Sequence, residues 1–214
     1  MGKCFYLISL LLIQVWCAVA YASTQQSLTV EYFDFYAKDI KQAIAEIKKN
    51  GPKSGQLDTW GMLYTDIDTH YTLRSNDTQC YVKPQKIEVI GEMHIPRWLN
   101  VENTSQTTQR WWQAFSKFVK QHEINHFDLA KSVAQSYFQS LHQMTPAQNC
   151  ATAKNQYYRL KRNMQREIVR QDDLLDQRTQ KTFLQQKTIS QPIIEALGTN
   201  ATIESGMMRN IVVF

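Results

Sequence analysis

Two histidines and one glutamate occur at a spacing that can bind a metal ion and activate a water molecule. The segment QHEINHFDLAK, residues 121–131, contains His122, Glu123 and His126 in the pattern H-E-x-x-H. On a helix, residues i and i+4 lie on one face, so the two imidazoles can bind one zinc ion. Zinc lowers the pKa of its water towards about 7, and a glutamate in reach can take the proton as the water attacks a carbonyl. The pattern predicts His122 and His126 as zinc ligands and Glu123 as the catalytic base.

A third zinc ligand has to come from elsewhere in the chain. The longer pattern H-E-x-x-H-x-x-G-x-x-H is absent, since Leu129 and Ser132 occupy its glycine and histidine positions. If the following helix forms a hairpin that turns near residue 145, the two histidines lie opposite residues 164–168. Glu167 is the best candidate there. Weaker candidates are Asp172, Asp173, His94 and His70.

Each of these assignments has a simpler structural alternative. The H-E-x-x-H segment can be an ordinary helix whose two histidines are satisfied on the surface or in the core. Glu167 lies among Arg162, Arg166 and Arg170 and can be an ordinary exposed carboxylate. The metal-site interpretation is favoured by three circumstances: the pattern lies on a predicted helix, this helix follows a sheet, and the chain carries an export signal.

The back half of the chain supplies the helices that must position these residues. From about Thr107 to Gln143, large apolar residues recur every three or four positions, which predicts one long amphipathic helix. Thr145-Pro146 then predicts the start of a second long helix, with proline at its first position, that runs to about Lys187. Residues 191–214 are expected to form an irregular C-terminal tail whose last residues, IVVF, dock on the sheet.

The front half of the chain alternates in the manner of strands. Residues 27–36, 56–74 and 80–95 predict strand regions, with Pro84 marking an edge or a bulge. Residues 38–50 predict one helix, which ends at Asn50-Gly51-Pro52. The expected fold class is therefore α+β: a small antiparallel sheet with one helix, followed by two long antiparallel helices that carry H-E-x-x-H in a zincin-like arrangement.

The N-terminus has the composition of a cleavable export signal. Lys3 precedes an apolar run from Cys4 to Ala20, and Ala20-Tyr21-Ala22 has the small-residue pattern of a cleavage site. We predict a signal peptide over residues 1–22, cleavage after Ala22, a zinc-peptidase-like domain over 23–190, and a periplasmic or secreted location. The alternative is a retained anchor, although the run is only just long enough to span a bilayer.

Cysteine content and charge limit the environment and the partners of the mature chain. Of the four cysteines, only Cys80 and Cys150 lie outside the signal, and in an oxidising compartment they most simply pair. The alternative is two buried free thiols. Without Lys3 the formal charge falls from +5 to +4, too small an excess to indicate nucleic acid, and no nucleic-acid-binding motif is present. No other segment is apolar enough to form a stable membrane span.

Several features follow one another in an order shared with a known family. They are Gly51-Pro52 after a helix, the Trp60–Tyr71 strand, Cys80 opening the next strand, I-P-R-W at Ile95–Trp98, Trp112, the H-E-x-x-H helix, Cys150, and Asp176-x-x-Thr179. This order, over roughly residues 28–187, resembles the predicted secreted zinc-dependent proteases of bacteria, carried as domain of unknown function 922. The resemblance implies a zinc-peptidase-like domain with His122 and His126 as ligands and Glu123 as base.

The chain departs from that family's pattern at two places. Asn125 stands where a small residue often precedes the second histidine. Lys181-Thr182 stand where the helix end commonly reads Asp-x-x-Thr-x-His-Gly. If the missing histidine were a ligand, the site of this protein would be incomplete.

These observations predict a secreted or periplasmic zinc metallopeptidase, or a related amide hydrolase, that acts on a peptide or protein substrate. The alternative is a non-catalytic envelope binding or assembly module that retains the protease-like helix pair. Three ligands with an open position favour the enzyme, whereas a third side crowded by apolar groups favours the module.

Overall fold

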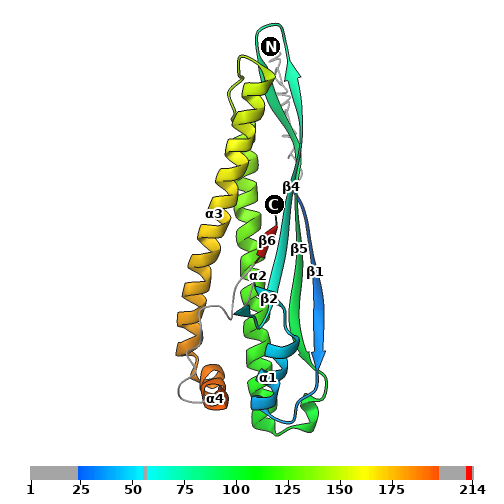
Figure 1. Cartoon of the computed structure of the whole chain (residues 1–214), viewed down its shortest axis with the longest axis vertical. Helices are drawn as coiled ribbons and strands as arrows, with labels where there is room; N and C mark the ends of the chain where they lie inside the picture. The colour runs from blue at the N-terminus through cyan, green and yellow to red at the C-terminus, as the bar shows by residue number, and fades with distance from the viewer. Residues whose placement is uncertain (1–23, 55–56, 198–210, 214) are drawn as a thin grey trace, which may run out of the picture.

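A slender α+β molecule results from one long hairpin of strands packed along two long helices (Figure 1). The computed structural model describes residues 24–54, 57–197 and 211–213. The predicted signal peptide over residues 1–22 lies outside these residues. Within the described ranges, none of the helices combines the length and the apolar character needed to cross a bilayer.

The main sheet has four strands in the order β1-β5-β4-β6. The strands are β1 (Thr24–Phe35), β4 (Met62–Ser75), β5 (Cys80–Trp98) and β6 (Ile211–Val213), and β2 (Lys53–Ser54) pairs separately with β3 (Leu57–Asp58). β4 and β5 form an antiparallel hairpin, whereas β1 is parallel to β5 and β6 is parallel to β4. The prediction of a wholly antiparallel sheet is therefore wrong. Only consecutive strands joined by a tight turn must be antiparallel, and neither β1 nor β6 has such a neighbour.

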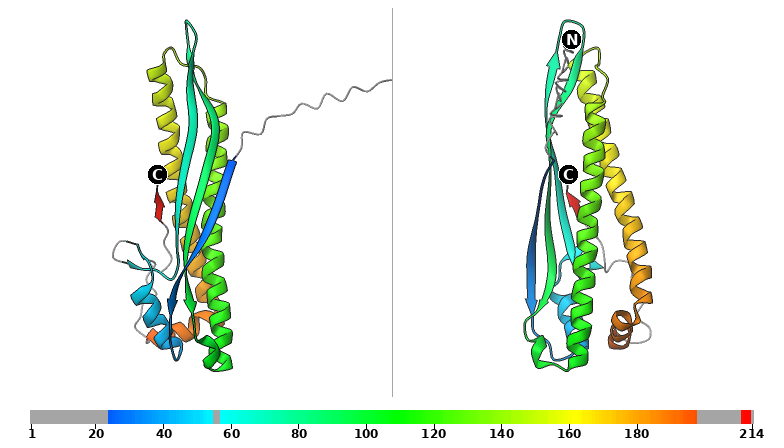
Figure 2. Two further views of the ribbon diagram at one scale, coloured as in Figure 1. Left: turned by 90° about the vertical axis from the view of Figure 1, so that its right-hand side faces the viewer. Right: turned by 180° about the vertical axis from the view of Figure 1, so that it is seen from behind.

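The β4–β5 hairpin is closed by a turn and bent by a bulge. Asn76 Oδ1 accepts hydrogen bonds from the backbone N–H groups of Thr78 (3.1 Å) and Gln79 (2.8 Å), which fixes the turn. The register shifts where Tyr71 pairs with Pro84, so the bulge predicted at Pro84 is confirmed. The hairpin extends past the end of β1 and forms an arm at one end of the molecule (Figure 2).

The helix α2 (Gln106–His142) carries the H-E-x-x-H segment along the sheet. Ser105 caps its N-terminus by accepting a hydrogen bond from the N–H of Thr108. Its buried face includes Phe127, against which Gly91 of β5 lies: a Cβ at Gly91 would approach the Phe127 ring to 2.8 Å. Glycine at this position therefore permits α2 to lie close to the sheet.

The second long helix, α3 (Cys150–Gln185), begins one turn later than predicted. Asn149 caps it through the N–H of Thr152 (2.9 Å), and the chain before it is extended. There Ala147 exchanges two backbone hydrogen bonds with Cys80, each 2.8 Å long. Since this bridge requires extended backbone, helix cannot start at Pro146.

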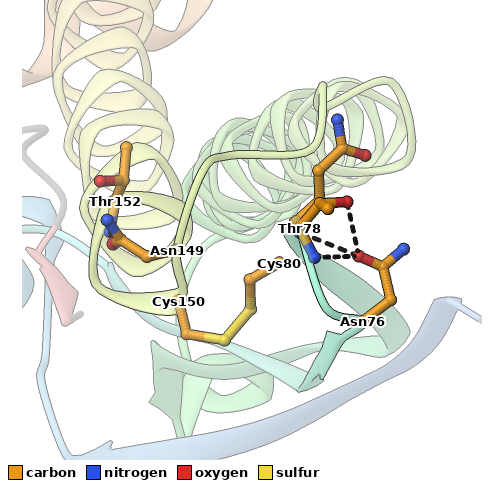
Figure 3. Close-up of a disulfide and its surroundings, with 7 residues drawn as sticks. Asn76, Thr78, Cys80, Asn149, Cys150 and Thr152 are labelled. Atoms are coloured by element: carbon orange, nitrogen blue, oxygen red, sulfur yellow. Dashed lines mark hydrogen bonds between the residues drawn. A yellow bond between two sulfur atoms is a disulfide. The ribbon is translucent and has the colours of Figure 1, made fainter.

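A disulfide joins the hairpin arm to the start of α3 (Figure 3). Cys80, the first residue of β5, is bonded to Cys150, and their Cα atoms are 4.9 Å apart. The predicted pairing of the two cysteines is confirmed, and the connection between α2 and α3 is held against the arm.

Two shorter α-helices and one 3₁₀ turn complete the fold at the end opposite the arm (Figure 1). α1 (Ile40–Asn50) is capped by Asp39, and η1 (Val101–Asn103) is a single 3₁₀ turn before α2. The segment after α3 forms α4 (Lys187–Leu197), so the first part of the predicted irregular tail is helical. Pro192 lies inside α4 and lacks the N–H for one backbone hydrogen bond, while Ile189 and Ile193 are buried on the apolar side of this helix. The expected docking of the chain end on the sheet is confirmed by β6.

Candidate metal centre

Three potential ligand atoms from α2 and α3 converge at a buried point between the two helices. Nε2 of His122 lies 3.1 Å from Nε2 of His126, and Oδ1 of Asp176 lies 3.3 Å and 2.9 Å from these two nitrogens. The exposed fractions of the side chains are 2% for His122, 1% for His126 and 15% for Asp176. Two nitrogens and one carboxylate oxygen therefore form one compact set of donors.

The Nδ1 atom of each imidazole, on the side away from the donor set, contacts a side chain of α3. Nδ1 of His126 donates to Oδ1 of Asp172 at 2.7 Å, and Nδ1 of His122 lies 3.2 Å from the hydroxyl of Thr179. A hydrogen bond at Nδ1 fixes the ring orientation and directs Nε2 towards the centre. Because α2 and α3 are antiparallel, the earlier histidine contacts the later aspartate: Asp176 lies beside His122, and Asp172 lies beside His126.

The donor set fits a tetrahedral zinc ion. Zinc bound at about 2.0–2.1 Å by nitrogen or oxygen in a regular tetrahedron places its ligand atoms about 3.3 Å apart. The three distances between the donor atoms here, 3.1, 2.9 and 3.3 Å, approach that value. Three such ligands would leave the fourth position for water or substrate, as in catalytic zinc sites.

Glu123 lies beside this set on the sheet side of α2. The residue is 1% exposed, and among the described residues nothing bonds to its Oε2. A Cβ at Gly61, just before β4, would lie 3.0 Å from Oε1 of Glu123 and 2.7 Å from Cγ1 of Val119, so only glycine leaves room for this carboxyl group. Burial raises the pKa of Glu123 to about 8. The carboxyl group can therefore exchange a proton near neutral pH.

The two histidines differ in their electrostatic surroundings. Burial lowers the pKa of His122, and its hydrogen bond to Asp176 opposes this only in part. Burial also acts to lower the pKa of His126, but hydrogen bonds to Asp172 and Asp176 outweigh it and raise the pKa to about 9. The pKa of Asp176 is lowered because its bonds to both histidines outweigh its burial. In the absence of a cation, a protonated His126 is therefore favoured by its hydrogen bonds to Asp172 and Asp176.

The third ligand predicted from the sequence, Glu167, is not at this site. Its carboxylate accepts hydrogen bonds from Arg170 (2.9 and 2.6 Å) and Gln171 (2.8 Å), and the hydrogen bond to Arg170 lowers its pKa to about 2. Nine residues separate it from Asp176, or about 13 Å along a helix. The prediction of Glu167 as a ligand is wrong. The extended connection delays the start of α3, so the residues opposite His122 and His126 lie about two turns further along α3 than expected.

The weaker ligand candidates lie in three different places. Asp172 contacts His126 from behind, and Asp173, the next residue on α3, is exposed. His94 bonds to Glu92 at 2.6 Å. His70 of β4 lies with Asp68 and Glu88 in a second group of possible ligands, on the outer face of the hairpin.

The prediction from the sequence did not name Asp176 as a candidate ligand, although the sequence carries a signal for it. Asp172 and Asp176 repeat on α3 the i, i+4 spacing of His122 and His126 on α2. On two facing antiparallel helices, both histidines can contact both aspartates in one register only. The matched spacing therefore predicts which residues of α3 lie opposite His122 and His126. The Asp-x-x-Thr pattern at Asp176–Thr179 supplies both one donor atom and the group that holds His122.

The chain belongs to a bacterial family of unknown function. Residues 30–183 match the family model described as "Bacterial protein of unknown function (DUF922)". The matched range contains the sheet hairpin, both long helices and every residue of the donor set. No curated protein and no solved structure matches the chain.

Proposed function

We propose that this member of the family is an exported zinc-dependent peptidase, or a related amide hydrolase, with His122, His126 and Asp176 as the zinc ligands. The observation that carries the proposal is the convergence of two imidazole Nε2 atoms and one carboxylate oxygen at spacings of 2.9–3.3 Å. The family assignment leaves the activity open, so the proposal depends on this geometry.

The surrounding residues have separate roles in this proposal. Asp172 and Thr179 hold the two imidazoles, so that the donor atoms are placed before any ion binds. When bound, zinc acts as a Lewis acid that polarises a carbonyl and acidifies a water molecule. Glu123 accepts the proton of the attacking water and returns it to the leaving amine, a task suited to a carboxyl group with a raised pKa.

Export is supported by the disulfide and by the bacterial family. A disulfide between Cys80 and Cys150 persists in the periplasm or outside the cell, whereas the cytosol keeps thiols reduced. The predicted signal over residues 1–22 agrees with this location.

The decisive test replaces Glu123 by glutamine. Glu123→Gln keeps the size of the side chain but cannot accept the proton, so the variant should fold, keep its zinc and lose about 10²–10⁴-fold in rate. A broad peptide library is digested by the wild type and by Glu123→Gln, and zinc is measured in both. Equal cleavage by the two proteins contradicts the mechanism. Absence of any cleavage by zinc-loaded wild type favours the alternative, a non-catalytic envelope binding or assembly module.

A further inference from the structure

The donor set opens to the surface through a groove between α2 and α3. The groove has a volume of about 350 Å³, and His122 and Thr179 are among the residues that line it. The other lining residues are Phe118, Gln121, Asn125, Leu175, Arg178, Thr182 and Gln186. A molecule bound in this groove would lie directly against one of the proposed zinc ligands.

The described residues that line the groove carry one positive charge and no negative one. Among them Arg178 is the only Lys or Arg, and neither Asp nor Glu occurs. Within the part of the chain that the structure describes, the guanidinium of Arg178 makes no hydrogen bond or ion pair. By contrast, Arg97 is paired with Asp34 and Arg170 with Glu167. Arg178 therefore lines this groove without an acidic partner among the described residues.

We infer that Arg178 binds a carboxylate of the peptide substrate and so positions that peptide against the metal centre. A guanidinium binds a carboxylate through two parallel hydrogen bonds, which fixes orientation as well as charge. Phe118 and Leu175 line the same groove and offer apolar contact to the side chain beside that carboxylate. The inference rests on the proposed function, because it names the class of peptide that the centre receives.

Polar groups in the groove suit the backbone of such a peptide. Nε2 of Gln121 donates to Oδ1 of Asn125 at 3.0 Å, which leaves the carbonyl of Gln121 and the amide N–H groups of Asn125 for a ligand. Gln121 and Asn125 line the same groove as Arg178 and His122. The carboxylate can be the C-terminus of the peptide or an acidic side chain within it, and the two sources can be separated by synthesis.

The test measures binding rather than cleavage. Zinc-loaded Glu123→Gln protein is titrated with three fluorescently labelled, N-acetylated tripeptides: Ala-Ala-Phe with a free C-terminal carboxylate, the same peptide as its amide, and Ala-Glu-Phe amide. The double variant Glu123→Gln/Arg178→Gln is titrated in parallel. Its matched control is Glu123→Gln/Arg162→Gln, since Arg162 is an exposed arginine of the same helix outside the groove. Zinc content is measured in every variant.

We expect Arg178→Gln to weaken the binding of one carboxylate-bearing peptide about 10-fold or more, while the neutral amide is unaffected and Arg162→Gln changes nothing. Loss for the free acid identifies the chain end as the source, and loss for the glutamate peptide identifies the side chain. The inference is overturned if Arg178→Gln weakens all three peptides equally, weakens none, or if no peptide binds. Absence of binding by every peptide would contradict the proposed function as well, whereas peptides that bind but do not depend on Arg178 contradict this inference alone.

Discussion

Two groups of potential metal ligands in this chain have similar chemistry and opposite surroundings. His122, His126 and Asp176 lie between two helices with side-chain exposures of 2%, 1% and 15%. Asp68, His70 and Glu88 lie on the outer face of the β4–β5 hairpin with exposures of 59%, 41% and 25%. Both sets of donor atoms lie close enough together to surround one ion. Proximity of donors therefore does not by itself distinguish a metal centre.

The two groups differ in the other partners of their ligand side chains. In the buried group, Asp172 and Thr179 fix both rings from outside. In the exposed group, Nε2 of His70 is already shared between Glu88 (2.7 Å) and Asp68 (3.3 Å), and the ammonium of Lys86 lies 3.0 Å from Glu88. A cation would have to displace Lys86 there, in competition with water. We therefore propose the buried group, and not the exposed one, as the metal centre.

The largest difference between the groups is expected when one histidine is removed from each. His126→Ala should abolish zinc binding, leave Asp172 buried without its imidazole partner and leave Asp176 with His122 alone, which costs about 3–5 kcal/mol of unfolding free energy. His70→Ala should leave zinc content and stability almost unchanged, because water replaces the lost contacts. Denaturant unfolding and metal analysis of both variants check this. Zinc that follows His70 instead would reverse our assignment.

Removing the disulfide tests whether the hairpin arm supports the buried group. Cys80 and Cys150 are 70 residues apart, for which chain entropy predicts a loss of about 4 kcal/mol or less in the Cys80→Ser/Cys150→Ser variant. The zinc stoichiometry at low temperature should stay the same, because the donor set lies further along α2 and α3. Thermal unfolding with and without zinc measures both effects, and loss of zinc from the still-folded variant would show that the arm positions the site.

Replacing Asp176 and Glu167 in turn decides which acid is the third ligand: Glu167, as predicted from the sequence, or Asp176, which lies beside both histidines in the structure. Asp176→Asn should lower zinc affinity by at least 100-fold, since it removes a charged ligand. Glu167→Gln is the matched control and should leave the affinity unchanged, because the carboxylate of Glu167 is bonded to Arg170 and Gln171, away from the donor set. Competition with a chromophoric chelator gives both affinities. Weaker binding by Glu167→Gln alone would contradict the register of the two helices.

The smallest effect is expected from the carboxylate behind His126. Asp172→Asn can still hold the imidazole but lacks the charge, so zinc affinity should fall about 10–100-fold while one zinc still binds at saturation. The same chelator competition measures it. An unchanged affinity would mean that orientation of the imidazole does not depend on the charge of Asp172.

The local parts of this architecture could be predicted from the sequence, and the long-range parts could not. Periodicity located α2 to within one residue at each end, and the bulge at Pro84 followed from the missing N–H of proline. The parallel pairing of β1 with β5 joins segments about sixty residues apart, and nothing local encodes it.

The metal centre shows the same division between local and long-range information. His122, Glu123 and His126 share one helix, and their spacing alone brings them together. The third donor depends on the register between two helices, which the bridge between Cys80 and Ala147 helps to set. A hairpin model without that bridge selected Glu167, and the paired spacing of Asp172 and Asp176 was the better signal.

The most direct test of the assignment is X-ray absorption at the zinc edge of the protein loaded with one equivalent of zinc. The account predicts multiple-scattering features of two imidazoles, with nitrogen and oxygen ligands at about 2.0–2.1 Å and no sulfur. These features should be lost in His126→Ala and kept in His70→Ala. A spectrum with a single imidazole that disappears in His70→Ala, or a protein that does not retain one zinc, would contradict the buried centre of His122, His126 and Asp176.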